Sequence, residues 1–299
     1  MIFASIDIGS NAIRLLFANI FENDKGMLTP VRTAFIRVPI RLGSDVFSMG
    51  TISPEREQKL LKTLAAFKTL IEVNDAVTYE AVATSAMREA ANGAQIITRI
   101  EKELKLKVRI IDGQEEAEII REAGEFNTYN SKLPMTMFVD VGGGSTEISV
   151  QKGHAFVNSQ SFNLGTLRLL NKAEDAEEWT RLNDWLMQFK PYFGQIECVG
   201  SGGNINKITK LFGDKEKKTI SFKQFEKAYQ NLSKLSVSER MNTYNLRVDR
   251  ADVIVPASEI YLKIMKTIQS NYILAPKIGL ADGLVINLFK NYQKQLSLQ

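Results

Sequence analysis

Apolar and polar positions alternate on both sides of a glycine triplet near the middle of the chain. The stretch Phe138–Val150 reads Phe-Val-Asp-Val-Gly-Gly-Gly-Ser-Thr-Glu-Ile-Ser-Val, with β-branched residues before and after the glycines. This pattern predicts two strands joined by a tight turn. The stretch Phe3–Phe17 has the same plan, and its Asp7 lies 133 positions before Asp140. Two such hairpins predict two similar lobes whose turns face each other across a cleft.

Helical spacing of apolar residues fills the regions after these hairpins. Ser53-Pro54 reads as an N-cap followed by a proline in the first turn, and apolar residues then recur at helical spacing through Ile71. Asn92 to Gln95 resembles a capping box that opens another helix. Val248–Ser270 reads as one helix that is apolar on all sides. Helices that follow strand groups in both halves predict an α/β fold.

The chain is long enough for two compact domains, with 299 residues. The polar, turn-rich segment 127–134 reads as the crossing between them. We therefore expect an N-terminal lobe over residues 1–126 and a C-terminal lobe over residues 127–299. In this division the last helix could also pack back on the first lobe.

Composition and charge narrow the function classes. Hydrophobic residues make up 44% and charged residues 24% of the chain, as in an ordinary globular protein. No apolar run is long enough for a membrane span, and Asp7 interrupts the only candidate for a signal-peptide core, so we expect no membrane association and a cytoplasmic location.

Positive charge is concentrated in one segment. Residues 207–250 hold 11 Lys and Arg against 5 Asp and Glu, within a net charge of +4 for the whole chain. Such a segment could steer polyanions, or be the solvated surface of lysine-rich helices. Because no nucleic-acid motif is present, binding to duplex nucleic acid is not expected.

Histidine and cysteine are nearly absent. The one histidine, His154, follows Gly153 in a predicted hairpin turn, so the chain cannot build a multi-histidine metal centre. The one cysteine, Cys198, has apolar neighbours and reads as a buried, inert thiol in a reducing compartment. Hydrolysis by this chain would need a carboxylate base, a metal ion, or both.

The glycine triplet is the strongest candidate for a phosphate site. Gly142, Gly143 and Gly144 have no Cβ, so a phosphate can approach bare backbone N–H groups, and Ser145 and Thr146 add hydroxyl donors. Taken alone, the same pattern also fits an ordinary glycine-rich hairpin.

Carboxylates and arginines accompany the predicted turns. Asp140 and Glu147 stand on the two sides of the triplet, where they could hold a divalent cation. Arg14 follows the first turn and Arg88 follows a strand end, and either could bind phosphate or pair with a surface acid.

Two further stretches carry candidate chemistry. The pair Glu115-Glu116 stands at a strand-to-helix turn, where one glutamate could activate water or both could be acids favoured by the helix dipole. Gly202 and Gly203 lie in the glycine turn 200–204 that opens a helix, which is a weak signal for an anion site.

Five motifs occur in an order that resembles the exopolyphosphatase/guanosine pentaphosphate phosphatase family, within the actin, sugar kinase and Hsp70 ATPase superfamily. They are Asp7-Ile-Gly-Ser-Asn with Arg14, Ala83-Thr-Ser-Ala-Met-Arg88, Ile111-Asp-Gly-Gln-Glu-Glu-Ala117, Asp140-Val-Gly-Gly-Gly-Ser-Thr-Glu147 and Gly200-Ser-Gly-Gly-Asn204. The likeness runs from about Ala4 to Leu284, nearly the whole chain. Longer members carry an additional C-terminal helical domain, so the resemblance is to a short form.

The resemblance implies two ribonuclease H-like lobes with an interlobe cleft and the hydrolytic release of terminal phosphate from polyphosphate or guanosine pentaphosphate, with Mg²⁺. It implies Glu116 as the base that activates water, Arg14 and Arg88 as phosphate clamps, and Asp140 and Glu147 as the acids associated with the metal. The residues that it implies as a phosphate cradle are Gly9, Ser10, Asn11, Gly142, Gly143, Gly144, Ser145, Thr146, Gly202 and Gly203. Because members are often dimeric, it also implies a homodimer.

Two other functions remain open at this point. The chain could be a non-catalytic sensor that binds polyphosphate or an alarmone through the same turns, or an ATPase or kinase of the same superfamily. Phosphate release by the wild type and not by an active-site variant would separate the hydrolase from the sensor. The sequence does not choose between polymer and nucleotide as substrate.

Overall fold

The computed structural model describes residues 1–22, 28–126, 133–173 and 175–297. By their contacts the residues divide into two compact units, one of residues 1–128 and 279–299 and one of residues 129–278. The predicted limits of 1–126 and 127–299 differ from this division in residues 279–299. Most of the predicted crossing segment, residues 127–132, lies outside the described residues.

The first unit is built on a mixed five-stranded sheet with the strand order β3-β2-β1-β4-β5. The β1–β2 and β2–β3 pairs are antiparallel, and the β1–β4 and β4–β5 pairs are parallel. Its elements are β1 (Ile2–Ile8), β2 (Ile13–Glu22), β3 (Leu28–Val38), α1 (Leu42–Met49), α2 (Pro54–Val73), β4 (Thr78–Ala83), α3 (Ser85–Glu89), α4 (Gly93–Leu104), β5 (Arg109–Ile110), α5 (Gly113–Phe126) and α13 (Leu280–Ser297).

The second unit is built on a mixed sheet of six strands with the order β10-β11-β9-β6-β7-β8. Its elements are β6 (Met135–Val141), β7 (Thr146–Lys152), β8 (Ala155–Phe162), α6 (Thr166–Leu170), α7 (Ala176–Met187), the 3-10 turn η1 (Lys190–Tyr192), β9 (Ile196–Ser201), α8 (Gly203–Phe212), β10 (Thr219–Ser221), α9 (Phe222–Ser233), α10 (Val237–Tyr244), α11 (Val248–Ala251), α12 (Ile254–Thr267) and β11 (Tyr272–Leu274). Read from the other edge, β8-β7-β6-β9-β11 repeats the order of the first sheet. The two sheets confirm the predicted α/β class with its repeated ribonuclease H-like plan.

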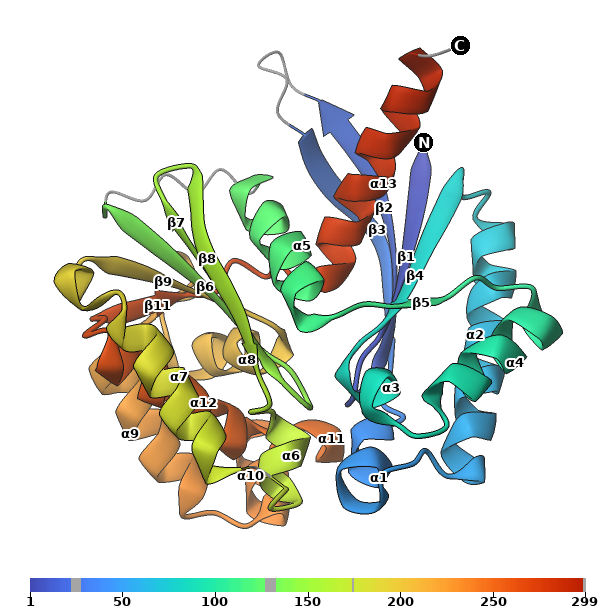
Figure 1. The fold of residues 1–299 in the computed structure, drawn as a ribbon. Coiled ribbons are helices and arrows are strands. Elements are labelled where there is room, and N and C mark those ends of the chain that lie inside the picture. The colour runs from blue at the N-terminus through green and yellow to red at the C-terminus, as the bar shows by residue number, and fades with distance from the viewer. Residues whose placement is uncertain (23–27, 127–132, 174, 298–299) are drawn as a thin grey trace. The chain divides into compact units, whose positions relative to one another are not determined.

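The last helix, α13, completes the first unit. It packs on β1, β2, β4 and α5, and Figure 1 shows α13 and α5 on the face of the first sheet opposite to α2 and α4. Ser5 Oγ donates to the carbonyl of Ala281 at 2.8 Å, and Arg32 binds the buried Asp282 carboxylate through Nε at 2.8 Å and Nη2 at 2.7 Å. Burial raises the pKa of Asp282, and Arg32 opposes that shift.

Each unit has its own apolar core. In the second unit β6, β7 and β9 bury their apolar residues against α7, α8, α9 and α12, with Phe162, Phe225 and Tyr261 among the largest buried side chains. In the first unit Phe3 and Leu16 pack on Val285 and Phe289 of α13. Among the helices of the described residues, none is both long and apolar enough to cross a bilayer.

Several local predictions are confirmed, and two are wrong. Ser53 caps α2 as predicted, Cys198 is buried, and His154 lies exposed in the turn between β7 and β8. The side chain of Asn92 does not cap α4, because its amide binds the backbone N–H and carbonyl of Ile52 at 3.0 and 2.8 Å. The segment 248–270 forms two helices, α11 and α12, in place of the single helix expected.

Candidate active site

The glycine triplet forms the turn between β6 and β7. The strands pair in register up to Val141 and Thr146, and the N–H of Gly142 donates to the carbonyl of Ser145 at 2.9 Å. This bond closes a four-residue turn at the end of the hairpin, as the glycine and β-branched pattern predicted.

The start of α6 anchors the carbonyl groups of the triplet. The N–H groups of Thr166 and Leu167 donate to the carbonyls of Gly142 and Gly143 at 3.0 and 2.8 Å. Arg168 Nε donates to the carbonyl of Gly144 at 2.9 Å. All three carbonyls of the triplet are therefore turned toward α6.

The orientation of these carbonyls fixes the N–H groups of the same peptides. No peptide bond among the described residues is cis, and in a trans peptide the N–H points opposite to the carbonyl. The N–H groups of Gly143, Gly144 and Ser145 therefore point away from α6. Three neighbouring N–H groups on one side of a turn form a concave site suited to an anion.

Two other glycines fit closely around this turn. A Cβ on Gly165 would lie 2.3 Å from the carbonyl carbon of Gly144, so no larger residue fits behind the triplet without a shift. Gly202 has φ 91°, and a Cβ there would lie 2.8 Å from Asp140 Oδ1. Gly203 opens α8 directly after it.

Asp140 and Glu147 are cross-strand partners on β6 and β7. Directly opposed residues of an antiparallel pair lie on the same face of a sheet, so the two carboxylates share one face beside the triplet turn. Glu147 is buried, and its Oε1 accepts a bond from Ser161 Oγ at 2.9 Å. Two adjacent carboxylates are the ligand type that a hard divalent cation prefers.

Tyr261 supports the strands that carry this acid pair. Its hydroxyl lies 2.6 Å from the carbonyl of Ser201 and 3.3 Å from that of Val139, so it contacts both β9 and β6. Burial, and then the charge of Asp140, raise the pKa of Tyr261 well above its ordinary value. The hydroxyl therefore stays neutral and able to donate.

The turn between β1 and β2 repeats this construction in the first unit. The N–H of Gly9 donates to the carbonyl of Ala12 at 3.2 Å. The carbonyls of Ser10 and Asn11 accept bonds from the N–H groups of Gly43 at 2.9 Å and Arg41 at 3.1 Å. The start of α1 thus anchors this turn as α6 anchors the other.

Ser10 has a structural bond of its own. Its hydroxyl lies 2.9 Å from that of Ser85 and accepts a bond from the N–H of Ala86 at 3.2 Å. These contacts tie the first turn to α3, the element that also carries Arg88.

The two candidate arginines each have a structural partner. Arg14 forms an ion pair with the buried carboxylate of Asp7, its cross-strand partner on β1. Arg88 donates Nη1 to the carbonyl of Ile111 at 2.7 Å. A guanidinium has five N–H donors, so it can bind more than one acceptor at a time.

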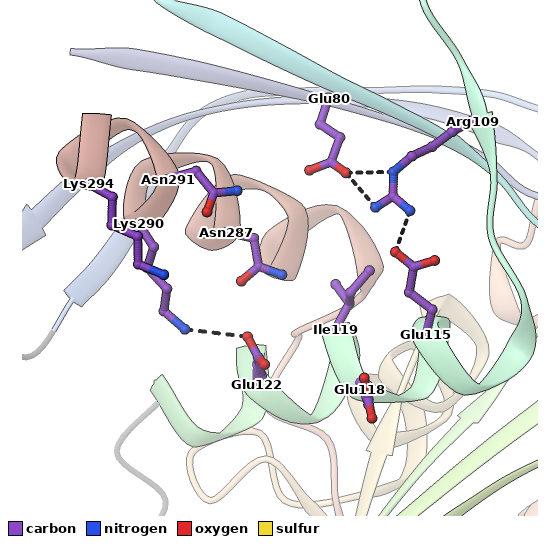
Figure 2. Close-up of a pocket in the computed structure, with 10 residues that line it drawn as sticks. All are labelled: Glu80, Arg109, Glu115, Glu118, Ile119, Glu122, Asn287, Lys290, Asn291 and Lys294. Carbon is purple, nitrogen blue, oxygen red and sulfur yellow. Dashed lines mark hydrogen bonds and ion pairs between the residues drawn. The ribbon is translucent and has the colours of Figure 1, made fainter. Parts of the chain in front are cut away.

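The adjacent glutamates of α5 differ in surroundings. Glu115 is half-buried and ion-paired with Arg109, which also binds Glu80 at 2.6 Å. Figure 2 shows Glu115, Glu118 and Glu122 lining a pocket of about 390 Å³ with the outer residues of α13. Glu116 does not line that pocket and is buried. The side chain of Asp112 caps this helix, accepting from the N–H groups of Gln114 and Glu115 at 2.9 and 2.8 Å.

Comparison with known proteins identifies the family of this chain. The sequence profile described as the Ppx/GppA phosphatase family matches residues 19–292. The chain belongs to this family. The prediction from the five motifs is thereby confirmed, although the β1–β2 turn lies before the first matched residue.

Two curated relatives illustrate the range of this phosphatase family. Exopolyphosphatase 1 of Mycobacterium bovis is 23% identical over 301 residues, which cover 94% of this chain and 86% of that protein. The bifunctional 3-dehydroquinate synthase/phosphatase of Fusobacterium nucleatum is 29% identical over 197 residues. That match covers 62% of this chain and only 29% of the longer relative.

Solved structures match nearly the whole of this Ppx/GppA chain. The Ppx/GppA family member of Aquifex aeolicus has a TM-score of 0.76 at 26% identity, with 97% of this chain and 98% of that chain covered. An exopolyphosphatase of Cytophaga hutchinsonii has a TM-score of 0.83 at 21% identity, with the same coverage. These matches confirm the predicted actin-like fold.

Sequence reasoning missed two arginines of this family member. Arg168 lies behind the glycine triplet. The spacing of residues in its helix did not predict its bond to the carbonyl of Gly144. Arg250 donates Nη1 to Asn204 Oδ1 at 2.8 Å, and a Cβ on Gly203 would lie 2.5 Å from its Nη2. Arg250 belongs to the basic segment 207–250, so the excess of positive charge was the available signal. Burial, followed by the charges of Lys210 and Arg250, lowers the pKa of Lys207 in the same segment.

Proposed function

We propose that this Ppx/GppA family member hydrolyses phosphoanhydride bonds, releasing terminal orthophosphate from inorganic polyphosphate, guanosine pentaphosphate, or both. The observation that carries the proposal is the turn after β6, whose three N–H groups point away from α6 beside the Asp140 and Glu147 carboxylates. An anion site next to two carboxylates suits a phosphate whose charge a divalent cation offsets. Membership of a phosphatase family supports hydrolysis over mere binding.

The acid pair fits Mg²⁺. Asp140 and Glu147 stand on one face of the sheet, and each supplies the oxygen ligands that this ion takes. Bound there, Mg²⁺ would neutralise charge on the phosphate oxygens. Gly142, Gly143, Gly144, Ser145 and Thr146 would hold the phosphate to be released, with Gly202 and Gly203 contributing at the start of α8.

The first unit supplies the remaining roles in the proposal. Glu116 takes a proton from the attacking water as the new P–O bond forms and the bridging P–O bond breaks, and the shortened phosphate chain leaves. Arg14 and Arg88 bind phosphate oxygens through their guanidinium groups, and Gly9, Ser10 and Asn11 add the second cradle. The ion pair of Glu115 with Arg109 supports Glu116 over Glu115 as the base.

Phosphate release from purified protein tests this function. Tripolyphosphate, long-chain polyphosphate, guanosine pentaphosphate and ATP are compared, with Mg²⁺ and with a chelator. Because the relative that covers 94% of the chain is named an exopolyphosphatase, polyphosphate is the first substrate to test. A preference for guanosine pentaphosphate would make the protein an alarmone phosphatase, and a preference for ATP would favour the ATPase.

The adjacent glutamates provide a matched pair of variants. Glu116→Gln should abolish release while polyphosphate still binds, because the amide cannot accept the proton. Glu115→Gln should keep most of the activity, since it removes only one partner of an exposed ion pair. Near-normal turnover by Glu116→Gln would refute the assignment of the base. Binding of polyphosphate without release by the wild type would indicate a sensor.

A further inference from the structure

Arg168 lies directly behind the turn proposed to hold the substrate phosphate. It is the third residue of α6, and its Nε donates to the carbonyl of Gly144 at 2.9 Å. The carbonyls of Gly142 and Gly143 are held by backbone N–H groups of the same helix start. Within the described part of the chain, the side chain of Arg168 thus holds the third carbonyl of the triplet.

The peptide that Arg168 holds has glycine on one side. Gly144 has no Cβ, so the peptide between Gly144 and Ser145 can turn over at a lower steric cost than a peptide between two residues with side chains. In one orientation the N–H of Ser145 faces the anion site, and in the other a carbonyl oxygen faces it. A bond from a charged donor is stronger than one from a neutral donor, so Arg168 favours the first orientation.

The corresponding turn of the first unit is held by different contacts. The β1–β2 turn is held from behind by the backbone N–H groups of Arg41 and Gly43. The bonds of the Ser10 side chain reach Ser85 and Ala86 of α3 and do not hold a carbonyl of the turn.

We propose that Arg168 is a positioning residue for phosphate binding. It holds the Gly144–Ser145 peptide with the N–H toward the substrate phosphate, and it acts through that peptide without touching the substrate. The proposal rests on the function proposed above, and it adds a residue that sets the affinity for phosphate.

Steady-state kinetics with tripolyphosphate test this role. Arg168→Met should raise KM by about tenfold, with a smaller change in kcat, because a charge-assisted bond that orients the binding site is lost. The KM of Arg168→Lys should lie between those of the wild type and Arg168→Met, since an ammonium keeps the charge but not the planar fork. Guanidinium ion at low concentration should restore part of the affinity of Arg168→Met. Lys62→Met, which removes an exposed charge on α2, is the control and should behave as the wild type.

A second measurement separates this proposal from the proposed function. The backbone N–H resonances of Gly143, Gly144 and Ser145 are followed during titration with tripolyphosphate. They should shift in the wild type and need about tenfold more ligand in Arg168→Met. Wild-type protein that binds without releasing phosphate refutes the hydrolase and leaves this readout intact.

The result against the positioning role is equally definite. Values of KM and titration midpoints in Arg168→Met within about twofold of the wild type would overturn it. So would wild-type resonances of the three residues that do not respond to tripolyphosphate. If Arg168→Met does not fold, Arg168→Lys decides by the same criteria, because it keeps the charge and the aliphatic stem.

Discussion

The turn between β1 and β2 and the turn between β6 and β7 close in the same way and differ in charge. Each is closed by an N–H to carbonyl bond across four residues, from Gly9 to Ala12 and from Gly142 to Ser145. Each follows an aspartate that is the last residue but one of its first strand, and each is held from behind by a following helix start. The residue opposite that aspartate is Arg14 in the first hairpin and Glu147 in the second.

This one difference gives the two turns different chemistry. In the first hairpin, Arg14 and Asp7 form an ion pair of opposite charges. In the second, two carboxyl groups, those of Asp140 and Glu147, stand directly opposite each other. The same backbone plan therefore carries an oppositely charged pair in one unit and an acid pair in the other.

The largest effect is expected from removing the acid pair of the second turn. Glu147→Gln keeps the shape but leaves one carboxylate, so turnover should fall by more than about 100-fold, because even residues behind a metal ligand can cost 10- to 100-fold. Mg²⁺ should raise the melting temperature of the wild type and not of the variant, since a ligand stabilises the state that binds it. A variant with unchanged response to Mg²⁺ would remove Glu147 from the metal site.

The next largest effect is expected from the glycine behind the triplet. Gly165→Ala introduces a Cβ 2.3 Å from the carbonyl carbon of Gly144, so the triplet must move and turnover should fall by about tenfold or more. Gly153→Ala is the control, because its Cβ meets nothing within 4 Å and only its left-handed φ of 59° is strained. Phosphate release by both variants, with circular dichroism for folding, compares them. Equal activity would show that the triplet tolerates displacement.

A moderate effect is expected from the ion pair of the first turn. Arg14→Gln leaves the buried Asp7 carboxylate without its arginine, which should lower the free energy of unfolding by about 1–3 kcal/mol. Adding Asp7→Asn should restore part of that loss, since the uncompensated charge is gone. Urea unfolding of the two single variants and the double variant measures the coupling. Strict additivity would mean that Asp7 and Arg14 do not stabilise each other.

The smallest effect is expected at Glu197, on the β9 strand beside β6. Burial raises the pKa of Glu197 above its ordinary 4.5, so the folded protein holds this proton more tightly than the unfolded chain. The contribution of Glu197 to stability is greatest at a pH below its ordinary pKa. It is lost as the pH rises through the raised pKa of the folded state.

Glu197→Gln removes this titration while keeping an acceptor for the Tyr272 hydroxyl, now 2.7 Å from Glu197 Oε1. Its melting temperature relative to the wild type should therefore rise between acidic and neutral pH. Glu226→Gln, at an exposed site on α9, should show no such trend. A constant difference between Glu197→Gln and the wild type would contradict the assignment.

The turns could be predicted from the sequence because their determinants are local. β-Branched residues around Gly142–Gly144 specify the strands, and a Cβ on Gly142 would lie only 3.0 Å from the carbonyl oxygen of Ser145. The same locality made the caps of α2 and the acidic first turn of α5 readable. Overlaying Asp7 on Asp140 then revealed the repeat.

The remainder depends on contacts distant in sequence. Helix α1 was not predicted, since it follows Arg41 in a left-handed conformation with no side-chain cap to announce it. The side chain of Asn92 binds the backbone of Ile52, 40 residues away, and therefore does not cap α4. The separation of Glu115 from Glu116 required Arg109 and Glu80, which come from two strands.

The return of α13 to the first unit determines when that unit can be completed during synthesis. Its central strands β1 and β2 leave the ribosome first, yet Phe3 and Leu16 are covered by residues of a helix made last. Until that helix emerges, one face of the early sheet exposes apolar surface, a state that favours aggregation. The second unit, continuous in the chain, has all its strands and helices before then. The part of the protein that is translated first is thus the part that finishes folding last.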